Sequence, residues 1–207
     1  YTSYLLVEKK NLFDDAQIRS FFKIIIFSVA ILTIYLAISK SAELNFRSVF
    51  FNIISILTGT GYVNAEFDTW GSFTLILFLG LMFIGGCAGS TTCGVKIFRI
   101  KIVDLFISNQ LKKMIYIKGV FVLKYDQNPI DNKFISSVIS FIYMYLVIFF
   151  VLTPLLSLTG LDFVTSISGA ATSISNVGPA LASILGPNGV FSSLTITSNW
   201  MLTLAII

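Results

Sequence analysis

The candidate chemical groups of this sequence are backbone carbonyls at two glycine-centred breaks in apolar stretches. The breaks are Thr58-Gly59-Thr60-Gly61-Tyr62 and Ser175-Asn176-Val177-Gly178-Pro179. Glycine adopts backbone angles that other residues avoid, so successive carbonyls can be turned toward one axis. A ring of carbonyls can replace the hydration shell of a monovalent cation. We therefore interpret both breaks as candidate cation-binding segments, to which the hydroxyls of Thr58, Thr60 and Ser175 would add uncharged oxygen ligands.

Each break follows a segment too short to cross a membrane. Residues 47–58 would form a helix of roughly 18 Å, whereas the hydrocarbon core is about 30 Å thick, and residues 162–175 are of the same length class. We expect two half-helices whose C-terminal ends add partial negative charge near the cation. The chain beyond them would be non-helical, which is tolerated at membrane depth only if it is buried in protein or lines a cavity. The alternative for Thr58–Tyr62 alone is a tight turn between two helices of a hairpin.

A weak internal repeat relates the two breaks. Shifting the sequence by 117 residues, the interval from Gly61 to Gly178, places the apolar run 24–39 on 141–156. The order of parts then recurs: a spanning run, a short segment rich in small residues, a glycine break and a second spanning run. Such internal repeats are common in transport proteins.

The composition favours a membrane protein. The chain is 56% hydrophobic and 12% charged, whereas soluble domains are about 25% charged. Histidine is absent, which removes His-based catalytic triads and the usual zinc ligand sets. A membrane enzyme would need an acid, base or nucleophile that the apolar core lacks, and no membrane-embedded carboxylate supports a proton relay. We interpret the two cysteines, Cys87 and Cys93, as packing residues.

The basic residues predict an orientation. They cluster before the first apolar run and within residues 96–133, and none follows Lys133. The positive-inside rule then places the N-terminal segment and the 96–133 linker in the cytoplasm, with residues 40–70 and Asp162 outside. The linker could also contact a cytoplasmic partner or anionic lipid headgroups.

A third unusual stretch lies inside the run that follows Trp70. It comprises Gly85, Gly86, Cys87, Ala88, Gly89, Ser90, Thr91, Thr92, Cys93 and Gly94. Glycine costs about 1 kcal/mol relative to alanine in a helix interior, so a helix should break or loosen here. The hydroxyls of Ser90, Thr91 and Thr92 can satisfy backbone groups freed by the break. The alternative is close helix packing through small residues.

The three stretches resemble a known family. "ISILTGTGY" (54–62), "LMFIGGCAGSTTCGVKIFRI" (81–100) and "ATSISNVGPAL" (171–181) are similar to the C-terminal half of the membrane subunit of the Trk/Ktr/HKT potassium transporter superfamily, most like the bacterial Trk type. The resemblance implies an all-α membrane protein with four helix–pore loop–helix repeats around one pore. The third and fourth repeats would lie in this chain, with residues 85–94 as an intramembrane gate loop.

The resemblance also implies a division of the chain. The expected parts are a cytoplasmic segment (1–20), one repeat (21–95) with half-helix 47–58, filter 58–62 and broken second helix 70–95, a basic cytoplasmic linker (96–133), and a second repeat (134–207) with half-helix 162–175, filter 175–179 and a truncated last helix. The chain ends inside an apolar run, so we expect it to be a piece of a longer protein.

The implied function is potassium uptake through a carbonyl-lined filter. K+ would be the transported ion, with no organic cofactor, in a homodimer of the bacterial inner membrane that works with a cytosolic nucleotide-binding regulatory subunit; nucleic acid is not an expected partner. The alternatives are a Na+-conducting or Na+/H+-coupled transporter of the same fold, or an unrelated secondary transporter with broken helices.

The sequence departs from the family pattern at two places. Cys93-Gly94 stands where the family commonly has two glycines, and a side chain at Cys93 would stiffen the loop or narrow the passage. Gly59 stands where Thr or Ala is more usual, which would soften the filter. The family's arginine in the last membrane segment would lie beyond Ile207. Lys96 and Arg99 either influence ions near the cytoplasmic mouth or act as positive-inside anchors, and we favour the anchor.

Overall fold

The structure, a computed structural model, describes residues 15–39, 45–116, 123–125, 128–181, 186, 189 and 194–206. Within those ranges the regular structure is helical apart from a small hairpin of two-residue strands, which confirms the all-helical fold class, and non-helical segments connect the helices. The elements are α1 (Ala16–Ser39), α2 (Phe46–Thr58), η3 (Phe67–Trp70), α3 (Ser72–Phe83), α4 (Ile97–Ile115), β1 (Lys124–Tyr125), β2 (Asn128–Pro129), α5 (Asn132–Ser157), α6 (Phe163–Ser175) and α7 (Ile196–Ile206).

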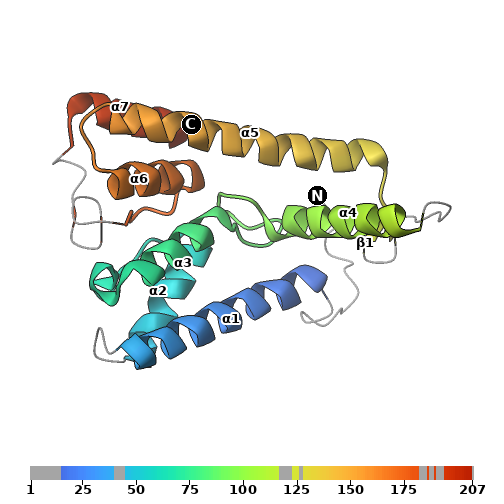
Figure 1. Ribbon diagram of the computed structural model, residues 1–207, viewed down its shortest axis with the longest axis horizontal. Helices are drawn as coiled ribbons and strands as arrows, with labels where there is room; N and C mark the ends of the chain where they lie inside the picture. The colour runs from blue at the N-terminus through green and yellow to red at the C-terminus, as the bar shows by residue number, and fades with distance from the viewer. Residues whose placement is uncertain are drawn as a thin grey trace, which may run out of the picture.

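Among the described residues, two helices are long and apolar enough to cross a membrane. They are α1, with 24 residues, and α5, with 26. At about 1.5 Å per residue, both exceed the roughly 30 Å of a bilayer core. Figure 1 shows them on opposite sides of the molecule, with α2, α3 and α6 between them. Large apolar side chains such as Phe27, Ile38 and Phe150 remain exposed on their outer faces, as expected of surfaces that contact lipid.

The two short helices α2 and α6 are related by the 117-residue offset, because Phe46–Thr58 shifted by 117 is Phe163–Ser175. Each has 13 residues, so each spans only about 20 Å. Their observed starts lie one residue from those expected for the half-helices 47–58 and 162–175.

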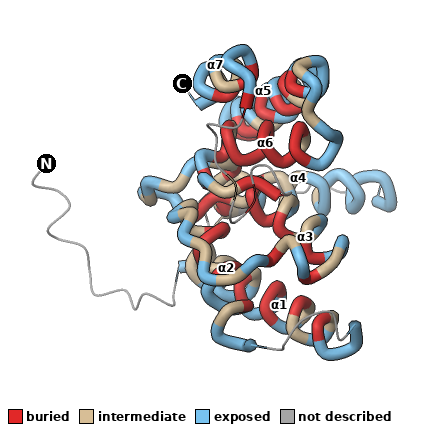
Figure 2. Tube along the Cα trace, turned by 90° about the vertical axis from the view of Figure 1, so that its left-hand side faces the viewer, coloured by how far each residue is buried: buried red, intermediate tan, exposed pale blue. Residues whose placement is uncertain are grey.

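Helix α6 is the most enclosed element of the described chain. It packs against α3, α5 and α7, and Figure 2 shows it as an almost continuous buried tube. Its buried residues are mainly small: Thr165, Ser166, Ser168, Gly169, Ala170, Ala171, Thr172, Ser173 and Ser175. Small side chains let neighbouring backbones approach closely.

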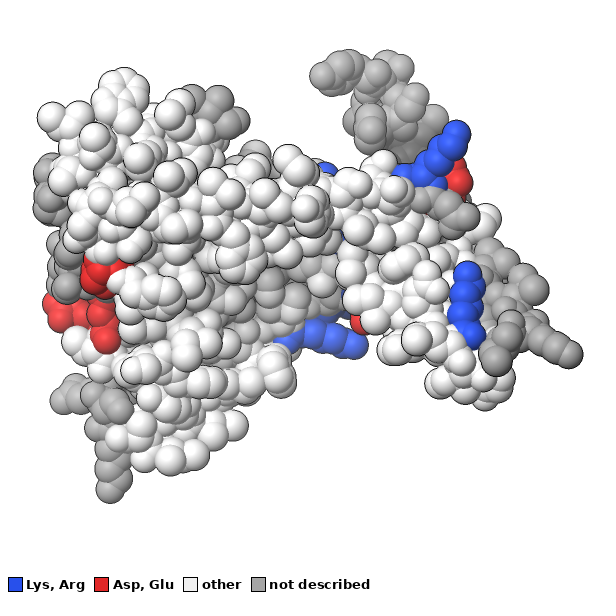
Figure 3. All heavy atoms as spheres, turned by 45° about the horizontal axis from the view of Figure 1, so that its top comes forward, with Lys and Arg blue, Asp and Glu red and all other residues white. Residues whose placement is uncertain are grey.

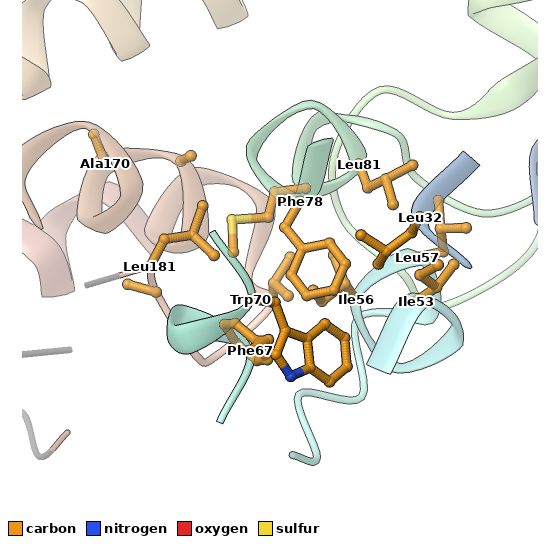
Figure 4. Close-up of a cluster of buried hydrophobic side chains, with 14 of the residues drawn as sticks. Leu32, Ile53, Ile56, Leu57, Phe67, Trp70, Phe78, Leu81, Ala170 and Leu181 are labelled. Carbon is orange, nitrogen blue, oxygen red and sulfur yellow. The ribbon is translucent and has the colours of Figure 1, made fainter. Parts of the chain in front are cut away.

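An apolar core holds the first break in place. Phe67 and Phe78 pack edge to face with ring centroids 5.0 Å apart, and Trp70 lies against the same Phe78 ring. Figure 4 shows these rings beside Leu57 and Ile53 of α2, with Leu181 approaching from the side of α6. The residues after each break therefore belong to one continuous core.

The second apolar run is broken more sharply than the range 70–95 implies. Helix α3 ends at Phe83, and a new helix, α4, begins at Ile97 and continues to Ile115. Most of the first half of the expected linker 96–133 is thus a 19-residue helix, which packs against α5 through Ile102, Ile135 and Val138. Lysine, glutamine and leucine favour helix, so the charge pattern that predicted a linker did not exclude this.

Charges separate along the molecule. In the view of Figure 3, the charged atoms seen at one end are acidic, whereas Lys and Arg atoms, with some acidic atoms beside them, lie from the centre to the other end. This separation agrees with the orientation expected from the positive-inside rule.

Candidate functional site

The first break begins where α2 ends. Gly59 caps the helix in the left-handed region, at φ 65°, and its amide donates to the Ile56 carbonyl at 3.1 Å. The Thr60 amide donates to the Ser55 carbonyl at 3.0 Å. Gly61 returns to positive φ, at 70°. Alternate residues thus have left-handed backbone angles, the pattern expected for carbonyls turned toward one side.

The second break repeats this geometry at the same offset. Asn176, the counterpart of Gly59, caps α6 in the left-handed region with φ 50°. The Val177 amide donates to the Thr172 carbonyl at 3.1 Å, as that of Thr60 does to Ser55. Gly178, the counterpart of Gly61, has φ 109°, and its amide donates to Thr172 Oγ1 at 3.0 Å. The 117-residue offset therefore relates individual backbone hydrogen bonds of the two breaks, as well as the helices before them.

The two breaks face each other. A β-carbon on Gly178 would lie 3.6 Å from Gly61 Cα, and one on Gly61 would overlap the Val177 carbonyl oxygen. Both positions have positive φ, where side chains are also strained. Glycine is therefore required at position 61 for two independent reasons, and the structure places the two candidate segments side by side.

The far ends of both segments are tied back to their own half-helices. Buried Asn52 of α2 donates to Asn64 Oδ1 at 2.8 Å. The hydroxyl of buried Ser168 of α6 lies 2.7 Å from the Leu181 carbonyl oxygen and 2.7 Å from that of Val164. Each segment is thus held at its base and just beyond its far end.

The hydroxyl groups expected to face a cation have other partners. Thr58 Oγ1 donates to the Ile54 carbonyl at 2.7 Å, and Thr60 Oγ1 lies 3.1 Å from Ser55 Oγ. Ser175 is buried, with its hydroxyl 2.6 Å from that of Tyr145. The side chains of Thr58 and Ser175 thus brace the ends of α2 and α6. A hydroxyl oxygen that takes part in one hydrogen bond still has a free lone pair, so Thr58, Thr60 and Ser175 stay predicted oxygen ligands beside the backbone carbonyls.

Residues 85–94 form a loop with a closed neck. Ile84 and Val95 form a parallel bridge, in which the Gly85 amide donates to the Val95 carbonyl and the Val95 amide to the Phe83 carbonyl, both at 2.9 Å. A β-carbon on Gly85 would overlap the Cys93 carbonyl oxygen. The two strands of the neck can approach this closely only because residue 85 is glycine.

Hydroxyl groups fill the inside of the loop, as the sequence predicts for Ser90 and Thr92. Thr92 Oγ1 accepts from the Gly86 amide at 2.8 Å and lies 2.7 Å from Ser90 Oγ. Ser90 Oγ in turn lies 2.7 Å from the Cys87 carbonyl. These contacts replace helical hydrogen bonds that the break removes.

Two polar side chains hold the loop from outside. Lys96 Nζ donates to the Ser90 carbonyl at 2.6 Å. Gln17, near the start of α1, accepts from the Ala88 amide through Oε1 at 2.9 Å. Lys96 therefore has a specific partner in the loop, which neither interpretation drawn from the sequence included. Arg99 stacks over the Phe141 ring at 3.9 Å, linking α4 to α5.

The loop lies against the base of the first segment. A β-carbon on Gly59 would be 3.7 Å from Thr92 Cγ2 and 3.8 Å from the Asn176 carbonyl oxygen. The same Thr92 closes the inside of the loop, so the loop and both candidate segments meet around Gly59.

A cavity of about 440 Å³ opens between α6 and α7, beside the second segment. Asn199 and Thr203 of α7 line it opposite Asn176 and Gly178. Asn199 and Thr203 are four residues apart, so they share one helix face, and that spacing is the signal by which the sequence could have identified them. Tyr145 and Gln17 carry no comparable signal.

Asp162 is the N-cap of α6. Its carboxylate accepts hydrogen bonds from the Thr165 hydroxyl and from the Thr165 amide, the latter at 3.2 Å. The bond from the Thr165 hydroxyl is the largest cause that lowers the pKa of this carboxyl below its ordinary value; burial opposes it, and bonds from backbone amides add to the lowering. An ionised carboxylate at this position also interacts favourably with the helix dipole.

The described part of the chain is all-helical, with two helices long and apolar enough to cross a membrane and two 13-residue half-helices, which is the class of membrane transport proteins. The family of cation transport proteins named TrkH matches residues 8–207. The chain belongs to this family, so the predicted superfamily is confirmed, as is the prediction of a transporter class over an enzyme.

Proteins of similar sequence and structure carry names that agree with this family. The chain is 34% identical over its whole length to the Trk system potassium uptake protein TrkI of Halomonas elongata, of which it covers 42%. It is 27% identical over 91% of its length to the Trk system potassium uptake protein TrkH of Escherichia coli, of which it covers 39%. The crystal structure of the potassium transporter TrkH from Vibrio parahaemolyticus superposes with a TM-score of 0.84 at 27% identity, covering 94% of this chain and 42% of that one. The chain thus spans about two fifths of the length of these relatives.

Proposed function

We propose that the chain forms part of a potassium uptake protein, in which Thr58–Tyr62 and Ser175–Pro179 supply two of the ion-binding segments of one pore. K+ is the transported ion, and it enters down the membrane potential, which acts on one charge with about 2.3 kcal/mol per 100 mV. The names of the relatives support the choice of potassium.

The observation that carries the proposal is the approach of Gly61 to the Val177 carbonyl. Each of the two backbone segments follows the C-terminus of a half-helix and carries no charged side chain. The segments face one another at a place where a side chain would not fit. Preorganised carbonyl oxygens of this kind suit a bare monovalent cation. The residues Asn176 and Asn199, which line the adjacent cavity, would contact water around an ion as it leaves the segments.

The loop at residues 85–94 is proposed as the gate. Its contact with Gly59 through Thr92 supports a position on the ion path, directly beside the segments. Its neck is fixed by backbone hydrogen bonds, and its tip is held by Lys96 and Gln17. Opening would therefore require the tip contacts to break while the neck stays closed.

The remaining assignments follow the family. We propose that residues 21–95 and 134–207 are the third and fourth of four repeats, flanked by cytoplasmic residues 1–20 and 96–133. We further propose a homodimer in the bacterial inner membrane that works with a cytosolic nucleotide-binding regulatory subunit. The separation of charge in Figure 3 supports the orientation.

The proposal is tested by ion uptake with the full-length protein in a host that lacks its own potassium transport. Expression should restore growth at low potassium, and Gly61→Ser combined with Gly178→Ser should abolish the rescue while the protein still reaches the membrane. Rescue that survives both substitutions unchanged would overturn the assignment of the segments.

A further inference from the structure

Tyr145 of α5 contacts the base of the second ion-binding segment. Its hydroxyl lies 2.6 Å from Ser175 Oγ, and the two side chains are 7% and 2% exposed. Ser175 is the last residue of α6, directly before Asn176, which turns the chain into the segment. The hydrogen bond therefore fixes the sideways position of the half-helix end from a helix 30 residues away in the sequence.

The ring of Tyr145 contacts the neck of the gate loop. It packs edge to face on Phe83, with centroids 6.0 Å apart and ring planes at 79°. Phe83 is the residue whose carbonyl accepts from the Val95 amide to close the neck. The Phe83 ring also packs edge to face on Phe149, with ring centroids 4.9 Å apart, so these two contacts restrict its movement.

These two partners of Tyr145 stand directly before a break in the helices. Ser175 precedes the second segment, and Phe83 lies at the neck of the loop. One side chain thus meets the half-helix end with its hydroxyl and the loop with its ring.

The chemistry of the two hydroxyls makes this contact specific. A serine near the end of a helix usually bonds to a carbonyl three or four residues back, whereas Ser175 shares its hydrogen bond with Tyr145. A buried tyrosine hydroxyl needs a partner, because leaving it unpaired costs the desolvation of that group. Each side chain therefore constrains the other.

We propose that Tyr145 is a positioning residue that sets ion selectivity by holding the second ion-binding segment and the gate loop in a fixed relation to each other. This inference rests on the proposed function, since it names a residue that shapes the same site without touching the ion.

The first test compares potassium and sodium fluxes through the full-length protein in proteoliposomes. Tyr145→Phe removes the hydroxyl and keeps the ring, and it should lower the ratio of potassium to sodium flux about fivefold, the effect of one buried hydrogen bond. Tyr143→Phe is the matched control, because Tyr143 is 65% exposed on the same helix, and its ratio should not change.

Two further variants separate positioning from general stability. Ser175→Ala should lower the ratio as much as Tyr145→Phe does, and the double variant should lower it no further, because both substitutions remove one bond. A purely structural role would reduce both fluxes in proportion and leave the ratio unchanged. An unchanged ratio in Tyr145→Phe, or additive effects in the double variant, would overturn the proposal.

A second readout does not depend on transport. In the full-length protein, Tyr145→Leu removes the aromatic ring that packs on Phe83 and should speed hydrogen exchange of the Val95 amide, which donates to the Phe83 carbonyl, several-fold, while Tyr145→Phe should leave it unchanged. Equal exchange rates in Tyr145→Leu and the parent would overturn the contact with the neck of the loop. Failure of the parent protein to carry potassium would instead overturn the proposed function, and the exchange rates would still decide the role of Tyr145.

Discussion

The Lys96 ammonium group binds the Ser90 carbonyl at 2.6 Å, and this contact closes the gate loop back onto the first turn of α4. Hydrogen bonds from a charged donor are among the stronger ones in proteins. The lysine is also next to the neck, since Val95 precedes it. The charge pattern of the sequence favours Lys96 as a membrane anchor. In the structure, Lys96 also holds the tip of the loop against the neck of the same loop.

Removing this contact should loosen the loop. Lys96→Met keeps most of the side-chain volume and removes the donor, so potassium flux through the full-length protein should rise several-fold. Flux through proteoliposomes of matched protein content is the measurement. Lys112→Met on the exposed side of α4 is the control and should behave as the parent. Equal fluxes in Lys96→Met and Lys112→Met would contradict a holding role for Lys96.

Glycine at position 61 should be essential. Gly61→Ala places a methyl group against the Val177 carbonyl and strains a backbone with φ 70°, so potassium uptake should fall by about tenfold or more, because an overlap of this kind costs roughly 1–3 kcal/mol. Gly80→Ala is the matched control, because a β-carbon there meets no atom within 4 Å and Gly80 lies inside α3. That variant should transport normally and unfold at a slightly higher temperature, since alanine favours helix. Parallel losses in both variants would point to general damage.

Asn52 should be important for holding the exit of the first segment. Asn52→Ala removes a buried hydrogen bond to Asn64 and should destabilise the protein by about 1–3 kcal/mol. Thermal unfolding in detergent measures this, and Asn64→Ala in the same background should add little, because the Asn52 side chain takes part in both hydrogen bonds that join the two residues. Gln110→Ala, an exposed change on α4, should leave the midpoint unchanged. Independent, additive losses at 52 and 64 would show that the bond does not join them.

The cap of α6 should make stability depend on pH. The pKa of Asp162 is lowered in the folded protein. The ionised carboxylate therefore stabilises the fold fully at pH values above the pKa of the unfolded chain, about 4. This stabilisation is lost as the pH falls through the lowered pKa of the folded protein. Asp162→Asn should still cap the helix and should flatten this dependence, whereas Asp162→Ala should cost about 1 kcal/mol at neutral pH. Unfolding midpoints between about pH 6 and pH 3 test this, with Asp104→Asn, in an exposed part of α4, as the control. An acid-sensitive midpoint that persists unchanged in Asp162→Asn would exclude this carboxylate as its source.

The sequence predicts the helices well where composition and length decide them. The half-helices are predicted from apolar segments that end at a glycine or at Asn176. The first residue of each observed half-helix differs from the expected one by one position. The break at residues 85–94 follows from its four glycines, which no stable helix interior would carry. The superfamily is predicted from the order of residues in 54–62, 81–100 and 171–181.

Contacts across the fold were not predictable in the same way. The partner of Ser175 is set by how α5 crosses α6, and the partner of Lys96 by how the loop folds back. The sequence predicts oxygen ligands from Thr58, Thr60 and Ser175, but it could not show that Thr58 and Ser175 also brace the ends of their helices. The helix at 97–115 was missed because a basic composition suits both a surface helix and a linker.

The geometry shared by Ser55–Gly61 and Thr172–Gly178 occurs twice on one polypeptide, with Gly59 in one copy and Asn176 in the other. A channel assembled from identical subunits changes every copy at once when its gene mutates. Here each position can vary alone, so a substitution alters one side of the proposed ion path and leaves the other side as it was. Mutation can therefore change the two segments independently, one residue at a time.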